Sequence, residues 1–183
     1  FTIGSNAGDY GYTRNGSDAL NNLRAHRLQG IELNNDGSKL FLLFMDSLSD
    51  SVNGRLYEFN LSTPYDVSTL SIVTSAGIEI GTATQTGVTN PAGMRFSANG
   101  KKIFLVSHAH NGIQRVLQIS LSKGFDTSSF TIDGSRILGG SGNEMSEANT
   151  QTRGVAFSGS GLKIYIGSDR DTNNDEVYEY DLV

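Results

Sequence analysis

The chain has 183 residues, among them 14 Lys or Arg and 19 Asp or Glu, and its formal net charge is −5. An acidic balance of this kind lacks the basic stripes with which proteins bind nucleic acid or anionic membranes. No apolar run reaches the roughly 20 residues that span a bilayer. Because the chain has no cysteine, disulfides and thiolate metal sites are excluded as well. We therefore expect no nucleic-acid partner and no membrane insertion.

The N-terminal segment begins with a short apolar run and continues as a long irregular stretch. Phe1-Thr2-Ile3 matches the later run Phe130-Thr131-Ile132, so we expect it to be the last strand of a repeat. Tyr10, Tyr12 and Arg14 follow, and aromatic faces beside hydrogen-bonding groups suit a sugar ligand. Tyrosines that pin a long loop onto a sheet give the same pattern, so both interpretations stay open.

From residue 30 onward the chain repeats itself. Residues 30–42 return as 93–105 and again as 154–166, at nearly constant spacing. A second block follows at residues 55–61, 115–121 and 176–182, and a short third run follows at 70–73 and 130–132. A repeat of this length indicates that one structural unit is built several times. The predicted units are repeat 1 over about 30–73, repeat 2 over about 93–132 and repeat 3 over about 154–183.

Turn residues and apolar patterns predict four short strands per copy. Asp36-Gly37 and Asn99-Gly100 reach positive φ at low cost, so the first two strands should form a hairpin. The second strand is apolar throughout residues 40–44, which predicts burial on both faces, whereas residues 55–61 alternate and predict partial burial. One aromatic position of the second strand recurs in every copy and should be buried between adjacent units: Phe41, Phe104 and Tyr165.

Four-stranded antiparallel units of constant size are the blades of a β-propeller. The predicted fold class is therefore all-β, with three four-stranded antiparallel blades in a single domain over residues 1–183. Closed propellers have about 4–8 blades. We expect these blades to be part of a larger ring and the chain to be an excerpt or a processed product. The expected partners are further blades of the same parent chain or identical chains.

Two of these motifs carry a family resemblance. Residues 96–106, Phe-Ser-Ala-Asn-Gly-Lys-Lys-Ile-Phe-Leu-Val, resemble the blade motif of lactonase-like and TolB-like propellers. Residues 61–69 resemble a linker in propeller repeats of secreted bacterial and phage-associated proteins. The resemblance implies a propeller scaffold and an extracellular, cell-surface or virion-surface location. The turn proline of the family is Asn35, Ala98 or Gly159 here, and no catalytic residue of the family falls on a matching position.

The connections between strands indicate where a ligand would bind. In an up-and-down blade, the second and fourth connections share one end, and in this chain they are long and differ in every copy. Long irregular loops on a rigid frame are where binding usually occurs. Loops under no functional constraint also differ in sequence between copies, so this alternative stays open. The candidate ligand-binding residues at this end are Tyr10, Tyr12, Arg14, Asp46, Asp50, His108, His110 and Asn111. His108 and His110 could share a zinc or copper ion, or they are simply exposed polar loop residues.

Oxygen-bearing side chains alternate near the C-terminal end, at Asp169, Asp171, Asn173 and Asp175. Closely spaced oxygen ligands of this kind resemble the first half of a calcium loop. The pattern then departs from an EF-hand, because Asn174 stands in place of the turn glycine and Tyr180 in place of the closing Glu. A solvated turn is the alternative, since Asn and Asp are ordinary turn formers. Calcium is the one cofactor that the sequence suggests for these residues.

Catalytic signatures are not found in the sequence, where nothing resembles a nucleophile elbow, a P-loop or a dinucleotide fingerprint. We expect a non-enzymatic extracellular or virion-surface module that is a structural building block or binds a glycan or protein through its loops. A propeller hydrolase acting on a lactone or glycan is the alternative, and it would need metal-ligating side chains in the central channel. The charged candidates there are Glu32 and Arg95, which a charged pair between blades explains equally well.

Overall fold

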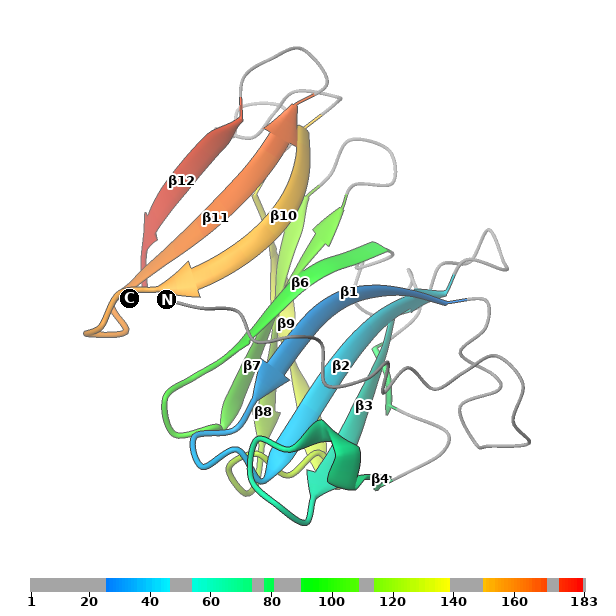
Figure 1. Cartoon of the computed structure of the whole chain (residues 1–183). Coiled ribbons are helices and arrows are strands. Elements are labelled where there is room, and N and C mark those ends of the chain that lie inside the picture. Colours follow the sequence, from blue (N-terminus) through cyan, green and yellow to red (C-terminus); the bar gives the residue numbers. More distant parts are fainter. Residues whose placement is uncertain are drawn as a thin grey trace, which may run out of the picture.

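The structure is a computed structural model, and it describes residues 26–46, 54–73, 78–80, 90–108, 114–138, 150–170 and 175–182. Within these residues the chain is all-β, with three antiparallel sheets and one short 3-10 helix, Val67–Thr69 (Figure 1). The all-β prediction is confirmed. The strand predicted at residues 1–3 lies outside the described residues.

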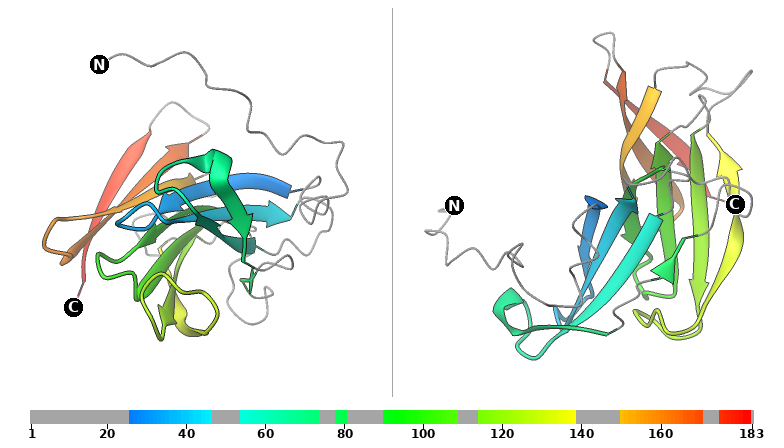
Figure 2. Two further views of the ribbon diagram at one scale, coloured as in Figure 1. Left: turned by 60° about the horizontal axis from the view of Figure 1, so that its bottom comes forward. Right: turned by 90° about the vertical axis from the view of Figure 1, so that its right-hand side faces the viewer.

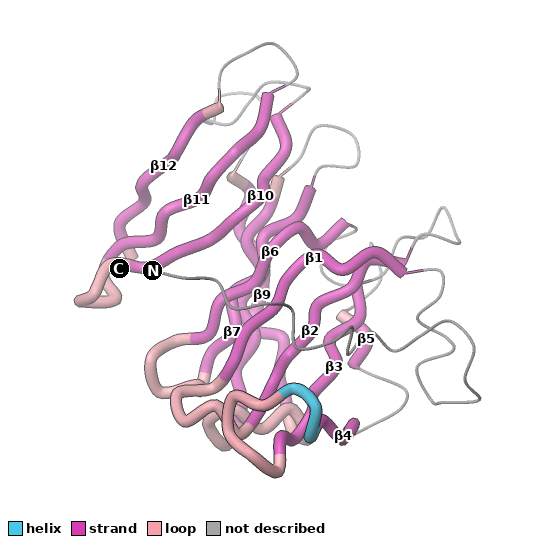
Figure 3. Tube along the Cα trace, viewed as in Figure 1, coloured by secondary structure: helices cyan, strands magenta, loops and turns pink. Residues whose placement is uncertain are grey.

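Consecutive strands pair in each sheet, so the chain runs up and down across it (Figure 3). The first sheet contains β1 (His26–Leu33), β2 (Lys39–Asp46), β3 (Gly54–Leu61) and β4 (Leu70–Ile72). The second contains β6 (Asn90–Phe96), β7 (Lys102–His108), β8 (Arg115–Leu121) and β9 (Phe130–Ile137). The third contains β10 (Thr150–Phe157), β11 (Lys163–Arg170) and β12 (Glu176–Asp181). This is the strand order that the repeat predicts, although each first strand begins before the predicted repeat boundary.

The first sheet also has a short strand that the sequence does not predict, β5 (Ile78–Glu79). β4 pairs with residues 59–61 of β3, and β5 continues along β3 at Arg55 and Leu56. In the second sheet a single strand, β9, pairs along all of β8 and passes a register shift. Gly134 adopts φ 144° beside this shift, and Thr74 is the matching residue of the first copy. A β-branched residue rarely adopts such a positive φ, whereas glycine does so readily.

The first strands of the sheets, β1, β6 and β10, lie side by side where the sheets meet, and the first and third sheets both pack against the second (Figures 1 and 2). Each first strand has a register shift at the same repeat position, next to Gly30, Gly93 and Gly154. A Cβ on Gly93 would lie 2.9 Å from the carbonyl oxygen of Arg153 on β10. Glycine therefore permits the close approach of neighbouring first strands. At Gly154 a Cβ would meet nothing within 4 Å.

Two apolar cores hold the sheets together face to face. The core between the first and second sheets includes Phe41, whose ring lies 4.6 Å from that of Phe96 and 6.4 Å from that of Phe125. The core between the second and third sheets includes Val106 and Ile166, both fully buried. Strands buried on both faces are what the continuous apolar runs in β2 and β7 predict.

Two burial predictions are wrong in part. Phe41 and Phe104 are buried as predicted, but Tyr165 is only half-buried, because no described sheet covers its side of β11. The alternation in residues 55–61 predicts partial burial, yet most of β3 is buried, including the side chain of Glu58. Glu58 can be buried because the second sheet supplies hydrogen-bond donors to its carboxylate.

Candidate functional site

A polar cluster at the interface of the first and second sheets centres on Glu58 of β3, which is 2% exposed. Lys39 of β2 pairs with Oε1 of this carboxylate, and its Nζ also donates to the carbonyl oxygen of Phe125 at 2.8 Å. Thr127 donates to Oε2 from its backbone N at 2.8 Å and from Oγ1 at 2.6 Å. A buried charge is tolerated when it is paired and hydrogen-bonded in this way. We call Lys39, Glu58 and Thr127 the carboxylate lock.

The turn before β9 positions the threonine of the lock. Phe125 adopts φ 55°, and its ring lies over Gly100, where any Cβ would collide with the ring. Asp126 accepts hydrogen bonds from the Oγ of Ser128 at 2.5 Å and from its backbone N at 3.0 Å, and these bonds hold the pKa of Asp126 below its usual value. The first copy builds the same turn, with Tyr65 at φ 64°. The repeated sequence therefore encodes this turn as well as the strands.

The lock positions are occupied differently in the other two sheets. In the second sheet the lysine is retained as Lys102, and Gln118 replaces the buried glutamate. In the third sheet Lys163 pairs with Glu179 and also with Asp181, at 3.1 Å for the latter. Hydrogen bonds to Glu179 and then Asp181 raise the pKa of Lys163. The Lys–Glu pair of the first sheet thus recurs on the third, but here the carboxylate is 49% exposed.

Among the described sheets, none packs on the outer face of the third sheet, which repeats the face that the first sheet buries against the second. Val177 is 74% exposed, whereas Leu56 at the same repeat position is 2% exposed. Tyr165 is half-buried, whereas Phe41 is fully buried. We call Tyr165, Val177 and Glu179 the open face. Sequence patterns could not reveal it, because the copies look alike and only packing distinguishes them.

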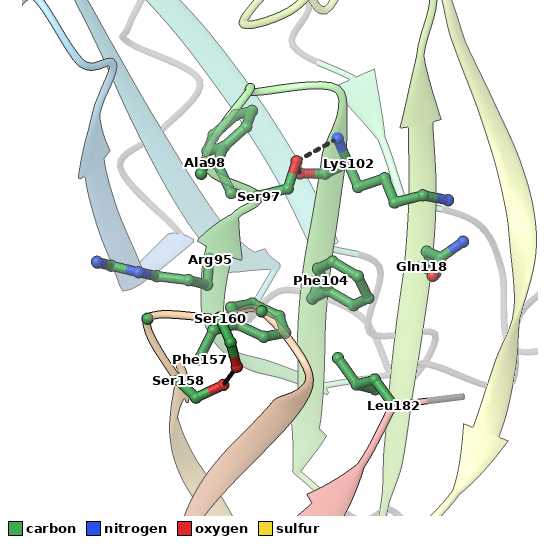
Figure 4. A pocket seen from close by; sticks show the side chains of 13 residues that line it. Arg95, Ser97, Ala98, Lys102, Phe104, Gln118, Phe157, Ser158, Ser160 and Leu182 are labelled. Carbon is green, nitrogen blue, oxygen red and sulfur yellow. Dashed lines mark hydrogen bonds between the residues drawn. The ribbon is translucent and has the colours of Figure 1, made fainter.

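A cavity of about 570 Å³ lies between the second and third sheets (Figure 4). The residues that line it include Lys102, Phe104 and Gln118 of the second sheet, and Phe157, residues 158–161 and Leu182 of the third. The rings of Phe104 and Phe157 lie 4.8 Å apart at its border. Lys102 and Gln118 lie on one side of the cavity and Phe157 and Ser158 on the other (Figure 4). Aromatic rings with a few polar groups are a usual lining for a ligand site.

The two charged candidates of the innermost strands pair with each other. Arg95 Nη1 on β6 lies 2.8 Å from Glu32 Oε1 on β1. Burial raises the pKa of Glu32, and the positive charge of Arg95 opposes that rise. The matching residue of β10 is Ala156, so this pair is not repeated between the second and third sheets. The charged pair between neighbouring units is therefore present, as one interpretation of the sequence predicts.

The described residues reach only the edge of the predicted loop site. Asp46 ends β2 and His108 ends β7, so both lie at the same end of their sheets. Their side chains lie outside the described part of the structure, as do residues Tyr10, Tyr12, Arg14, Asp50, His110 and Asn111. The hairpin turns occupy the opposite end, where Asn35 Nδ2 donates to the carbonyl oxygen of Ala98 at 2.9 Å. Ligand binding by the loops remains a prediction.

Two of the four candidate calcium ligands are described. Asp169 lies in β11, where its Oδ2 accepts hydrogen bonds from Arg153 Nε at 3.2 Å and Nη2 at 2.8 Å. Asp175 is exposed just before β12, and Asp171 and Asn173 lie outside the described residues. Over the described ranges, no three His, Asp or Glu side chains form a group that could hold a metal ion. Calcium binding remains a prediction.

Comparison with known proteins gives no family assignment. No family model matches the chain, and no curated protein matches it either. In the part of the chain that the structure describes, no helix has the length and apolar character needed to cross a membrane. Evidence for function must therefore come from the sheets and from the faces that they expose.

Proposed function

We propose that this chain is a three-blade portion of a β-propeller and serves as a non-enzymatic structural and binding module on the outside of a cell or virion. The face-to-face packing of the sheets supports the propeller, since β1, β6 and β10 are the strands through which neighbouring sheets approach. The open face carries the structural role, because Val177 and Tyr165 expose positions that the first sheet buries. A repeat position that is buried at one interface and exposed on another sheet is where a further contact of the same kind would form.

The proposed partner is a further sheet of the same repeat, supplied by the same parent chain or by an identical chain. At the interface of the first two sheets, the apolar side chains of the second sheet include Met94, Phe96 and Phe125. Their counterparts in the first sheet, Ile31, Leu33 and Tyr65, are exposed. Other counterparts on that face of the first sheet are already buried: Leu40, Tyr57 and Phe59. One chain therefore carries both halves of the interface on different sheets, and copies can join head to tail.

Two charge substitutions test this head-to-tail contact by sedimentation velocity. We expect the unsubstituted chain to self-associate as its concentration rises. Val177→Lys and Ile31→Lys should each prevent association, because each places an ammonium group in one half of the apolar interface. In a mixture, the intact first sheet of the Val177→Lys variant can still contact the intact third sheet of the Ile31→Lys variant. The two variants should therefore form a dimer, which grows no further because its remaining faces are both substituted.

Val73→Lys serves as the matched control, since it introduces the same cation at an exposed apolar side chain next to β4. This variant should associate like the unsubstituted chain. An unsubstituted chain that stays monomeric at every concentration, or a mixture of variants that does not dimerise, would contradict the proposed structural role.

Ligand binding is proposed for the end of the sheets where β2, β7 and β11 finish. The loops at this end differ in every copy, whereas the hairpin turns at the other end are nearly repeated. Asp46, His108 and Asp169 mark the position of this end in the three sheets. A glycan or protein ligand would suit the aromatic, amide and carboxylate side chains predicted for these loops.

A further inference from the structure

The outer edge of the second sheet is a long exposed strand. β9 (Phe130–Ile137) has 8 residues and pairs with β8 along one side, while no strand of the described residues pairs with its other side (yellow in Figure 2). In the first sheet the same edge is interrupted, because β4 has 3 residues and β5 has 2. Proteins often shorten or interrupt an edge strand in this way, since its unpaired N–H and C=O groups attract a further strand. β9 retains a full-length edge on which another strand can pair.

The side chains of β9 alternate between two faces, and the register shift lies in the middle of the strand. The face that β8 buries against the first sheet also carries four residues of β9, namely Phe130, Ile132, Ser135 and Ile137. Thr131 and Arg136 lie on the other face. Asp133 is the extra residue at the shift, between Ile132 and Gly134. The order of the two faces therefore reads the same from both ends of the strand.

We propose that β9 pairs antiparallel with β9 of a second copy of this chain, across a two-fold axis at the middle of the strand. Phe130, 39% exposed, then lies opposite Ile137 of the second copy, which is 47% exposed. Thr131 lies opposite Arg136 on the other face. The two-fold axis forms each of these pairs twice, and an aromatic ring opposite a β-branched side chain is a favourable cross-strand pair. Every side chain of one strand thus meets a side chain of the same face.

The register shift and the charges of β9 both favour a second copy as the partner. A strand without a shift offers one residue opposite Asp133 and Gly134, as β8 does, whereas a second β9 offers two. The Asp133 carboxylate accepts a hydrogen bond from Gln118 Nε2 at 2.6 Å, which places it on the face of Arg136. In the proposed register, Asp133 lies diagonally opposite Arg136 of the second copy, within reach of that long side chain. The edge of β9 is therefore complementary to itself in shape and in charge.

A contact through one strand edge is small. Stable complexes usually bury about 1,200–2,000 Å² of surface, and two paired edges bury less. We therefore expect a dissociation constant in the millimolar range, so the pairing matters where copies are already held close together. At the micromolar concentrations suited to sedimentation velocity it is barely populated. It also leaves the sheet faces free, so it is separate from the head-to-tail contact of the open face.

Disulfide trapping tests the proposed register, because the chain has no cysteine and each variant then carries a single thiol. Thr131→Cys and Arg136→Cys are mixed in a glutathione redox buffer, both with Val177→Lys to prevent the head-to-tail contact. Mass spectrometry should show a disulfide-linked dimer of the two variants. Each variant alone should give almost none, because two copies of the same residue lie roughly 15 Å apart along the paired strands and a disulfide needs Cα atoms within about 7 Å.

Ser71→Cys is the matched control, since Ser71 is exposed at the repeat position of Thr131 on the first sheet. Mixed with Arg136→Cys, it should give no linked dimer. Adding Ile137→Lys to both trapping variants should lower the yield about tenfold, because two ammonium groups then face the Phe130 rings. Absence of the mixed dimer, equal linking of either variant alone or of Ser71→Cys, or a yield that Ile137→Lys leaves unchanged would overturn the proposal. Failure would leave the head-to-tail contact untouched, because Val177→Lys has already removed it from the experiment.

Discussion

Phe41→Ala is expected to lower the free energy of unfolding by about 3–5 kcal/mol, the usual cost of truncating a buried phenylalanine. The side chain is fully buried, and its ring lies against those of Phe96 and Phe125 in the core that joins the first two sheets. Hydrogen-bonded strands on both sides limit how far the core can collapse into the space left behind. Urea unfolding followed by circular dichroism measures the loss.

The repeat supplies matched controls for this substitution. Phe104→Ala should cost less than Phe41→Ala, because Phe104 borders the cavity between the second and third sheets. Tyr165→Ala should cost least, because its ring is half-buried on the open face. Equal losses at the three positions would show that the outer face of the third sheet is covered, contrary to the interface proposed for it.

Lys39→Met is expected to lower the free energy of unfolding by about 2–3 kcal/mol. The substitution removes the cation from the carboxylate lock, so that Glu58, 2% exposed, keeps the donors of Thr127 as its partners among the described residues. Breaking a fully buried pair costs about 3–5 kcal/mol. The smaller loss is expected because Lys39 is itself 25% exposed. The same urea unfolding experiment measures it.

Two further variants show whether the loss comes from the uncompensated charge. Adding Glu58→Gln to Lys39→Met should recover most of the stability, because the neutral amide keeps an acceptor for Thr127 and needs no cation. The second sheet already has glutamine at this repeat position, as Gln118. Lys163→Met removes the matching lysine from the exposed pair of the third sheet and should leave the melting temperature almost unchanged. A loss at Lys163 as large as at Lys39 would mean that burial of the lock does not matter.

Most of the fold could be predicted from the repeat in the sequence. The hairpins follow from their turn residues, Asp36-Gly37 and Asn99-Gly100. The strand buried on both faces follows from the continuous apolar run at residues 40–44. Both features depend on local residues alone. β5 could not be predicted in this way, because it depends on where the fourth strand of the first copy stops. The propeller remains a proposal, since strand pairing within a sheet does not define how many sheets complete a ring.

The carboxylate lock could not be predicted, because its parts are distant in sequence and depend on a neighbouring sheet. Glu58, Gln118 and Glu179 occupy one repeat position, yet only Glu58 meets the threonine of the next unit, 69 residues away. Tyr165 and Phe41 also occupy one repeat position, and their different burial depends on whether a neighbouring sheet covers them, which the sequence pattern does not reveal. The predicted loop residues, such as Asp46, remain predictions, since their side chains lie outside the described residues.

The repeated interface and its uncovered copy are best tested by comparing Gly93→Ala with Gly154→Ala in urea unfolding. A Cβ on Gly93 would lie 2.9 Å from the carbonyl oxygen of Arg153, whereas a Cβ on Gly154 would meet nothing within 4 Å. We expect Gly93→Ala to lower the free energy of unfolding by about 1–3 kcal/mol, as overpacking does. Gly154→Ala should change it by no more than about 0.5 kcal/mol. Equal losses at the two glycines, or no loss at Gly93, would contradict the stacking of the sheets described above.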